Sequence, residues 1–299
     1  MKKVAIYGQS YSVKSEKEIN TLIEILDKNN VEFVIEKKFH DLLLDNNSIK
    51  KPYETYSTSS ALANGIDFMF TLGGDGTILR AVTFVRDLNI PILGINTGRL
   101  GFLATVKKDE IEEAMSLLIN KKYAIQERSL LEVQTTPESE EVAATNFALN
   151  DVTVARKNTT SMIGVKTYLN DEYLTNYWAD GLIIATPTGS TGYSLSCGGP
   201  VALPESKNFI ITPIAPHNLN ARPIIISDDT VIDLEVSTRE NNFLVSLDAR
   251  IITIPENTAI KISRAKFTIK TVLLQNQTNI KTLRGKLLWG EDTRNKAKL

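Results

Sequence analysis

The sequence predicts two domains of different class. The first is an α/β N-terminal domain with a mostly parallel sheet, and the second is an all-β C-terminal domain, antiparallel and sandwich-like. Up to about residue 104, short apolar runs alternate with segments of helical periodicity, the pattern of a parallel sheet covered by helices on both faces. After residue 125, strand patterns follow one another and helical signals nearly vanish until the end. The 299 residues are enough for two ordinary domains.

The elements of the first half follow from their periodicity. The helix at 15–30 is indicated by Ile19, Leu22, Ile23 and Leu26, which recur at the three, four and seven spacing of an amphipathic helix. The polar stretch 40–60 is expected to be an irregular connection. Short apolar runs predict strands at 3–8, 31–37, 67–72 and 90–96, and a second helix is expected at 77–88.

The second half reads as strands in sequence, several with the alternation of a half-exposed sheet. The expected strands are 130–136, 147–156, 162–170, 181–187, 208–216, 223–227, 231–237, 243–254 and 259–274. A joining helix is expected at 107–120, a short closing helix at 277–292 and a frayed polar tail at 293–299. The predicted domains are therefore 1–104 (α/β), 105–275 (mostly β) and 276–299 (helix and tail).

Composition narrows the class of protein. Apolar residues make up 42% of the chain and charged residues 23%, which is typical of a soluble globular protein. The net charge is −1, so the chain lacks the basic excess of a nucleic-acid-binding surface. Cys197 is the only cysteine, so no internal disulfide and no cysteine-based metal site can form. No run approaches 18 apolar residues, and the first residues do not resemble a signal peptide. We expect a cytoplasmic protein with neither nucleic acid nor membrane as partner.

The stretch "MFTLGGDGTILRAV", residues 69–82, places three glycines where a buried strand ends and a helix begins. In open α/β sheets ligands bind at that edge, outside the carboxyl ends of the strands. Gly73, Gly74 and Gly76 let backbone N–H groups approach an anion, and the following helix N-terminus, expected at Thr77, favours phosphate. The stretch is neither G-x-G-x-x-G nor a Walker A loop, so a Rossmann dehydrogenase and a P-loop kinase both fit poorly.

Asp75 is the unusual member of this turn. A carboxylate inside a phosphate cradle repels the ligand unless it holds Mg²⁺ or takes a proton from an attacking hydroxyl. The alternative is that Asp75 is a turn residue or a helix N-cap and that the glycines only shape the turn.

A second glycine-rich turn lies in the β half, within "ADGLIIATPTGSTGYSLSCGGPV" at 179–201. A buried strand runs into four hydroxyl side chains and two glycines, which offer neutral donors and acceptors to sugars, bases or phosphates. Tyr193 could stack on a base, and Asp180 stands just before the strand. The alternative is an elaborate β-turn whose hydroxyls cap the next segment.

Together these stretches resemble the NAD kinase family, from about residue 66 to 290. The matching motifs, in the family's order, are "GGDGT" at 73–77, "INTGRLGFLA" at 95–104, "LND" at 149–151, "ADGLIIATPTGSTGYSLSCGGP" at 179–200 and "PHNLNARP" at 216–223. "GGDG" alone is shared with diacylglycerol and sphingosine kinases and phosphofructokinases, whereas the "TPTGST-Y" block with the Asn-Asp pair upstream is specific. The resemblance implies the NAD kinase-like two-domain fold and transfer of the γ-phosphoryl of ATP to the 2′-hydroxyl of the adenosine ribose of NAD, giving NADP.

The resemblance also implies roles for particular residues. Asp75 corresponds to the proton acceptor, and Gly76 lies against the dinucleotide; Arg80 would contact a diphosphate and Phe102 would form a hydrophobic wall. The expected contacts in the second domain are Asn150 and Asp151 to the adenosine, Asp180 to the nicotinamide-side ribose and amide, and Thr191, Gly192, Tyr193, Ser194, Leu195 and Ser196 around the adenine end. The substrates are then NAD and ATP, the cofactor is Mg²⁺, and the assembly is a homo-oligomer, either a tetramer or a dimer.

The chain departs from the family's pattern at two places. Asp248-Ala249-Arg250 stands where many members read Asp-Gly-Gln, which puts a dinucleotide contact by that glutamine in doubt, and Gly192 stands where many carry alanine. Two other functions compete with the kinase assignment. A lipid kinase on the same two-domain plan would need an apolar acyl pocket, and a nucleotide-binding regulator without catalysis would gain nothing from the carboxylate of Asp75.

Overall fold

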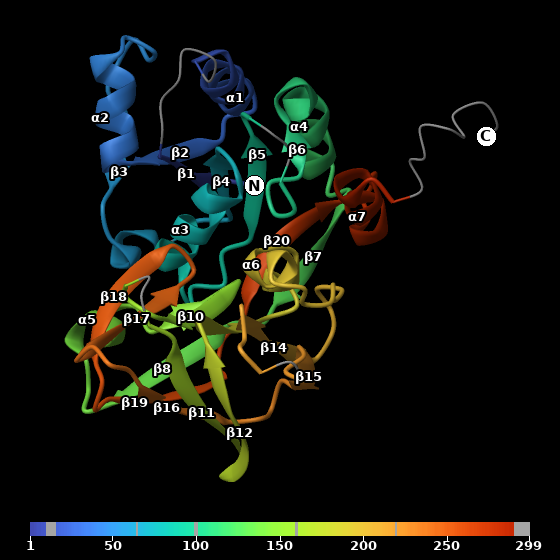
Figure 1. The fold of residues 1–299 in the computed structure, drawn as a ribbon. Coiled ribbons are helices and arrows are strands. Elements are labelled where there is room, and N and C mark those ends of the chain that lie inside the picture. The colour runs from blue at the N-terminus through green and yellow to red at the C-terminus, as the bar shows by residue number, and fades with distance from the viewer. Residues whose placement is uncertain (10–15, 64, 99–100, 159–160, 219, 290–299) are drawn as a thin grey trace, which may run out of the picture. The chain divides into compact units, whose positions relative to one another are not determined.

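The computed structural model describes residues 1–9, 16–63, 65–98, 101–158, 161–218 and 220–289 (Figure 1). The chain forms two compact units. The first unit combines Met1–Glu127 with Ile269–Leu299, and the second is continuous, Arg128–Thr268. The tail predicted at 293–299 lies outside the described residues. No helix among the described residues is long and apolar enough to cross a membrane.

The first unit is built on one sheet with the strand order β3-β2-β1-β4-β5-β20-β7, and β6 also pairs with β5. The pairings among β1, β2, β3, β4, β5, β6 and β20 are parallel, as the sequence predicts. The strands are β1 (Lys3–Gly8), β2 (Glu32–Glu36), β3 (Thr55–Tyr56), β4 (Phe68–Leu72), β5 (Ile92–Asn96), β6 (Val106–Lys107), β7 (Tyr123–Arg128) and β20 (Ile269–Leu274). Figure 1 shows β20, drawn in red, beside β7, drawn in green, although well over a hundred residues separate them in sequence.

Helices cover both faces of this sheet. Val4 and Ile6 of β1 pack into a core with α1 and α4, while Tyr7, which points to the opposite face, meets Phe84 of α3 with ring centroids 5.4 Å apart. The helical segments of the unit are α1 (Glu16–Lys28), α2 (Lys37–Asp45), η2 (Ser59–Leu62), α3 (Asp75–Val85), η3 (Lys108–Glu110), α4 (Ile111–Ile119) and α7 (Asn279–Leu287). The predicted helices at 15–30, 77–88, 107–120 and 277–292 are therefore present, but α3 begins at Asp75, two residues before the expected start.

The stretch 40–60 was predicted to be an irregular connection, and this was wrong for its first part. Helix α2 covers residues 37–45 because Phe39 and Leu43, four residues apart, are both buried. Glu36 caps the helix, and its carboxylate accepts a hydrogen bond from the Phe39 amide at 2.8 Å.

The two units divide the chain elsewhere than at the predicted 104 and 275. Residues 105–127 belong to the first unit because β6 pairs with β5 and because α4 packs on α1. The predicted strand 259–274 is two strands in different units, since β20 pairs with β5 while β19 (Ala259–Arg264) pairs with β8 (Leu131–Thr136). Chain periodicity identifies the strands here but not the sheet to which each belongs.

The second unit is a sandwich of two six-stranded sheets, with orders β15-β14-β13-β10-β17-β18 and β12-β11-β16-β19-β8-β9. The strand pairings among its described residues are antiparallel, and side chains of both sheets, such as Val154 and Val165, share one buried core. Its remaining strands are β9 (Phe147–Ala148), β10 (Asp151–Ala155), β11 (Ile163–Leu169), β12 (Glu172–Ala179), β13 (Gly181–Ala185), β14 (Asn208–Ile214), β15 (Ile224–Ser227), β16 (Ile232–Ser237), β17 (Asn242–Leu247) and β18 (Arg250–Pro255). The helical turns among its described residues are α5 (Glu140–Ala144), η4 (Gly189–Thr191) and α6 (Tyr193–Ser196).

The predicted strand 147–156 is interrupted. Residues 147–148 pair in one sheet as β9, and residues 151–155 pair in the other as β10. Leu149 and Asn150 form the corner between the two sheets, so the "LND" motif sits where the chain changes sheet.

Candidate active site

Asp75 lies at the carboxyl end of a fully buried central strand of the first unit. Strand β4 ends at Leu72, Gly74 is the N-cap of α3, and Asp75 is the first helical residue. Gly73 has φ +152°, and a Cβ built there would lie 2.1 Å from Oγ1 of Thr77, so only glycine fits this turn. The glycine turn predicted from the sequence is therefore present at the predicted edge of the sheet.

The carboxylate of Asp75 is held by backbone amides of the segment that follows "INTGRLG". Oδ2 accepts the N–H of Phe102 at 2.7 Å, and Oδ1 accepts the N–H groups of Leu103 at 3.0 Å and Ala104 at 2.9 Å. Charge-assisted bonds of this kind fix both the position and the orientation of the side chain. Phe102 thus touches Asp75 through its amide, a contact that the sequence did not indicate.

Gly101 makes this cradle possible. A Cβ on Gly101 would lie 1.7 Å from Oδ1 of Asp75, far inside van der Waals contact. Sequence reasoning missed this residue, although the glycine of "LGF" within the motif at 95–104 was the available signal.

The other predicted residues of the first unit lie along α3. Gly76 is exposed, and Arg80 lies one turn further along the helix. With the amide of Gln9 oriented to present its oxygen, that oxygen accepts hydrogen bonds from Nε of Arg80 at 2.8 Å and Nη1 at 3.1 Å. Arg80 is exposed and carries a charge that a diphosphate could pair with.

In the second unit, the corner at Leu149–Asp151 is fixed by a carboxylate from the turn between β17 and β18. Oδ2 of Asp248 accepts the N–H of Leu149 at 2.9 Å, while Oδ1 accepts those of Asn150 at 2.7 Å and Asp151 at 3.2 Å. Asp248 has φ +55°, the left-handed conformation that Asp and Asn tolerate. Although the Asp-Gly-Gln pattern is altered in this chain, its aspartate holds the Asn-Asp motif by three hydrogen bonds.

Arg250 and Thr186 secure the same corner from two further directions. Nη1 of Arg250 donates to the carbonyl of Thr145 at 2.6 Å, Nη2 donates to that of Phe147, and the guanidinium lies over the Phe147 ring. The hydroxyl of Thr186 donates to the carbonyl of Leu149 at 2.6 Å. Sequence reasoning did not predict these contacts of Asp248, Arg250 and Thr186, because their partners lie 37 to 105 residues away along the chain.

Asn150 and Asp151 differ in how their polar groups are satisfied. The side-chain oxygen of Asn150 is buried without a hydrogen-bond partner among the described residues, so it is free to accept a hydrogen bond from a ligand. Burial, and secondarily the nearby carboxylate of Asp248, raise the pKa of Asp151 to about 6, while a hydrogen bond from the Thr153 hydroxyl acts in the opposite direction. Burial also raises the pKa of Asp248, against the lowering effect of its three backbone donors.

Asp180 forms an ion pair with Arg156, with Nη2 and Oδ2 2.8 Å apart. The N–H of Arg156 also donates to the carbonyl of Asp180 at 3.0 Å, so the two residues are joined twice. The sequence indicated Asp180 but not its cationic partner.

The glycine-rich turn after β13 uses most of its hydroxyls internally. Ser190 donates to the carbonyl of Pro187 at 2.6 Å, and Thr191 donates to that of Thr188 at 3.2 Å. Ser194 is buried and shares a hydrogen bond of 2.8 Å with Thr212. Tyr193 instead has an exposed fraction of 48%, so its ring presents a face to a ligand. The remaining predicted positions, Gly192, Leu195 and Ser196, are half-buried or exposed in the same turn.

The close approach of this turn to the Asn-Asp corner requires a glycine. A Cβ on Gly189 would lie 2.0 Å from the carbonyl oxygen of Asn150. The structure thus brings Asn150, Asp151 and the turn 186–196 together within the second unit, as it brings Asp75 and Phe102 together within the first.

Among the described residues, no group of three or more His, Cys, Asp or Glu side chains could hold a metal ion. Mg²⁺ in phosphoryl-transfer sites is commonly held by one or two carboxylates together with the substrate's phosphates. A carboxylate offers about four lone-pair sites, and Asp75 uses three of them for backbone donors. The turn alone therefore offers too few ligands to hold Mg²⁺, and it fits a metal ion that is bound mainly by the phosphates of a nucleotide.

The fold and these two turns define a two-domain phosphotransferase, and comparison with known proteins identifies the family. A model of the ATP-NAD kinase N-terminal domain matches residues 4–123, and a model of the ATP-NAD kinase C-terminal domain matches residues 149–274. The chain belongs to the NAD kinase family and is an enzyme of that family.

Related proteins extend the match to nearly the whole chain. The NAD kinase of Christiangramia forsetii is 54% identical to this chain over 293 residues, an alignment that covers 98% of this chain and 100% of that protein. The NAD kinase of Bacteroides fragilis strain ATCC 25285 is 43% identical, and its alignment covers 98% of this chain and 99% of that protein. Among solved structures, an NAD kinase from Archaeoglobus fulgidus in complex with ATP has a TM-score of 0.74 and 26% identity, covering 96% of this chain and 98% of that one. A yeast NADH kinase complexed with NADH has the same fold, with a TM-score of 0.84 at 24% identity, covering 98% of this chain and 89% of that one.

Proposed function

We propose that this protein transfers the γ-phosphoryl group of ATP to the 2′-hydroxyl of the adenosine ribose of NAD, with Asp75 as the proton acceptor. The observation that carries the proposal is the carboxylate of Asp75, fixed by three backbone amides at the glycine turn of a family whose relatives are named NAD kinases. A lipid kinase is disfavoured by the same family membership.

The two oxygens of Asp75 have unequal capacity to accept a proton. Oδ1 already accepts two N–H groups, whereas Oδ2 accepts one and keeps a lone pair. We assign Oδ2 as the atom that receives the proton of the ribose hydroxyl. Because a hydroxyl has a pKa far above 7, a carboxylate within hydrogen-bond reach assists the attack on the γ-phosphorus.

Charge neutralisation is the second requirement of phosphoryl transfer. A bound Mg²⁺ held by the phosphates would neutralise part of their charge. The one free lone pair of Asp75 is assigned to the ribose proton, so Asp75 is not counted among the metal's ligands. The N-terminal end of α3 and the amides of its glycine turn would stabilise negative charge on the phosphates.

The residues of the second unit are proposed to bind the dinucleotide. Asn150, with its unpartnered buried oxygen, and Asp151 would hold the adenosine, and the exposed ring of Tyr193 would form a wall for the adenine. Asp180 would contact the nicotinamide-side ribose, with Arg156 holding its carboxylate in place. The protonated form of Asp151 can donate a hydrogen bond, because its raised pKa of about 6 keeps part of the population protonated near neutrality.

We further propose that the enzyme is cytoplasmic and acts as a homo-oligomer. The single cysteine, Cys197, fits a reducing compartment. Sheet edges such as β12 and β15 offer strands for pairing between copies.

The decisive experiment measures NADP formed from NAD, ATP and Mg²⁺ by the wild-type chain and by Asp75→Asn. General-base assistance is typically worth about 10²–10⁴-fold, so we expect turnover to fall by that factor. The variant also replaces one acceptor oxygen by an NH₂ group facing backbone donors, which should cost about 1–3 kcal/mol of stability.

Two controls separate chemistry from folding. The thermal transition shows how much of the variant is folded, and calorimetric titration with NAD shows whether dinucleotide binding persists. Wild-type turnover in Asp75→Asn would reduce Asp75 to a turn residue. Tight NAD binding by a wild-type chain that makes no NADP would favour the regulator without catalysis.

A further inference from the structure

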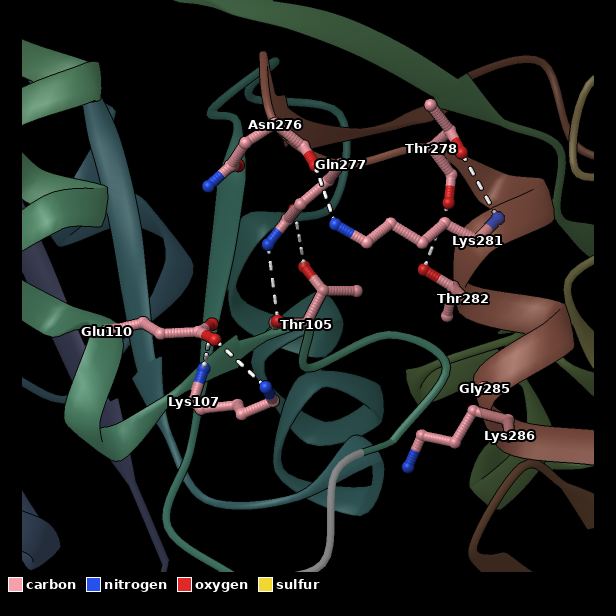
Figure 2. A pocket seen from close by; sticks show the side chains of 10 residues that line it. All are labelled: Thr105, Lys107, Glu110, Asn276, Gln277, Thr278, Lys281, Thr282, Gly285 and Lys286. Carbon is pink, nitrogen blue, oxygen red and sulfur yellow. Dashed lines mark hydrogen bonds and ion pairs between the residues drawn. The ribbon is translucent and has the colours of Figure 1, made fainter. Parts of the chain in front are cut away.

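A cavity of about 350 Å³ lies within the first unit, between the segment that follows the Asp75 cradle and helix α7 (Figure 2). Its volume falls in the range of small-molecule sites. None of the described residues that line it has an apolar side chain, and three lysines face one glutamate. The lining residues therefore carry an excess of positive charge, which suits an anionic ligand.

Hydrogen bonds across the cavity fix its walls. The hydroxyl of Thr105 donates to Oε1 of Gln277 at 3.0 Å, and Nε2 of Gln277 donates to the carbonyl of Thr105 at 3.2 Å. The hydroxyl of Thr278 accepts the N–H of Lys281 at 3.1 Å and so caps α7. The cavity is therefore pre-formed, which lowers the entropic cost of binding.

The positive charge of the cavity is only partly compensated. Lys107 is paired with Glu110, with Nζ and Oε1 2.9 Å apart. In the part of the chain that the structure describes, Nζ of Lys281 donates only to the carbonyl of Asn276, at 3.4 Å. Lys286 is half-buried and makes no ion pair or hydrogen bond with any described residue. Figure 2 shows both α7 lysines extending from the helix in the direction of Thr105 and Lys107.

The environment of Lys286 supports the need for an anion. Burial lowers the pKa of its ammonium group, and the negative charge of Asp75 acts in the opposite direction. A phosphate oxygen in the cavity would provide the partner that a half-buried cation otherwise lacks.

Two observations place the cavity near the Asp75 cradle. Thr105, which lines the cavity, directly follows Ala104, whose amide binds Asp75, and Lys286 is close enough to Asp75 for their charges to interact. An anion held here would lie beside the carboxylate that is proposed to accept the proton.

We propose that this cavity binds the polyphosphate chain of the phosphoryl donor, with Lys281 and Lys286 pairing with its phosphate oxygens. The proposal rests on the proposed function, because it is the position of Asp75 that makes the occupant a donor. The hydroxyl of Thr278 accepts the N–H of Lys281 and keeps its own O–H, which can donate a further hydrogen bond to a phosphate oxygen.

Steady-state kinetics of the full-length enzyme test the assignment. Lys281→Met and Lys286→Met remove an ammonium group and retain a side chain of similar length. Each should raise KM for ATP about tenfold, the usual order for loss of one charge-assisted hydrogen bond, and leave KM for NAD within about twofold. Lys108→Met is the matched control, because Lys108 is exposed on the neighbouring turn and does not line the cavity.

Calorimetric titration with tripolyphosphate adds a readout that needs no turnover. We expect the same two variants to lose affinity for tripolyphosphate about tenfold, and Lys108→Met to bind like the wild type. Equal affinity in all four proteins would overturn the proposal and leave the enzyme's function untouched. Tripolyphosphate binding that depends on Lys286, with KM for ATP unchanged, would overturn the assignment to the donor and identify a site for a free anion.

Discussion

Gly101 illustrates how one missing methyl group sets the geometry of a reacting side chain. A Cβ there would lie 1.7 Å from a carboxylate oxygen that three backbone amides already hold. Neither the carboxylate nor the backbone can move without losing hydrogen bonds. Gly101 therefore matters because it lacks a side chain and leaves room for the Asp75 carboxylate, and not because of its backbone conformation.

We expect Gly101→Ala to displace the Asp75 carboxylate. Displacements of about 1 Å can lower catalytic rates on the order of 10²-fold, and overpacking of this kind costs about 1–3 kcal/mol. The kcat for NADP formation and the thermal midpoint measure the two effects. Gly98→Ala is the control, since a Cβ at Gly98 meets nothing within 4 Å. Equal kcat values for both variants would show that Asp75 tolerates a looser cradle.

At the scale of elements, the hairpin between β17 and β18 supports the corner between β9 and β10. Asp248, at the turn of that hairpin, supplies a carboxylate to three amides of residues 149–151, and it also raises the pKa of Asp151. Both carboxyl groups titrate above their ordinary value of 3.8 in the folded chain. The folded state then binds more protons than the unfolded state between about pH 4 and 6, so this contribution to stability is present at low pH and is lost as pH rises through about 6.

Asp248→Asn tests this linkage, because asparagine tolerates the left-handed conformation but does not ionise. The variant should show a shallower fall in the free energy of unfolding between pH 4.5 and 7, since one titrating group is gone and the pKa of Asp151 is lowered. Urea denaturation at several pH values measures the slope. KM for NAD should also rise, because the corner that carries Asn150 loses an acceptor.

Asp229→Asn provides the comparison, since Asp229 is an exposed carboxylate in another turn of the same unit. Its stability curve should run parallel to that of the wild type, within about 0.5 kcal/mol. Parallel curves for Asp248→Asn as well would contradict the linkage between Asp248 and Asp151.

The elements also show what local pattern can predict. Buried strands such as β4 and β13 and the amphipathic helix α1 were predicted because periodicity depends only on neighbours in the chain. Helix α2 was missed because its burial comes from only a few side chains among polar neighbours. The break at Leu149–Asn150 was missed because it is imposed by Asp248, nearly a hundred residues away.

The candidate active site shows the same difference between residues that a local motif identifies and residues that act through distant contacts. Motif residues such as Asp75, Asn150 and Tyr193 were identified from the sequence, and their assignments to substrate remain predictions. Residues that act by contact with those side chains, such as Gly101 and Arg156, carry no sequence signal of their own beyond membership of a motif. The cavity beside α7 could not be foreseen, because it joins residues near 105 to residues near 280.

At the scale of the whole molecule, the first unit depends on the end of the chain. Strand β20 lies between β5 and β7, and its Ile269, Val272 and Leu274 are buried. Burying such side chains contributes about 1.5–3 kcal/mol each, a large part of the usual stability of a domain. The second unit is continuous and contains all the strands of its two sheets.

A chain that ends at Thr268 should therefore lose the first unit and keep the second. Limited proteolysis is expected to digest residues 1–127 and to leave a resistant fragment beginning near Arg128. A chain that ends at Trp289 retains β20 and α7 and serves as the control. Protection of residues 1–127 in the shorter chain would mean that β5 and β7 can be stable without β20.

The position of β20 also bears on how the protein is made. A ribosome that has released β7 must still translate the whole second unit before β20 emerges, which takes roughly 10–30 s at usual elongation rates. Throughout that interval β5 and β7 lack their shared partner, whereas the second unit has every strand it needs as soon as β19 has emerged. The unit encoded in the middle of the gene is therefore the first to be completed, and the unit that carries the N-terminus is the last.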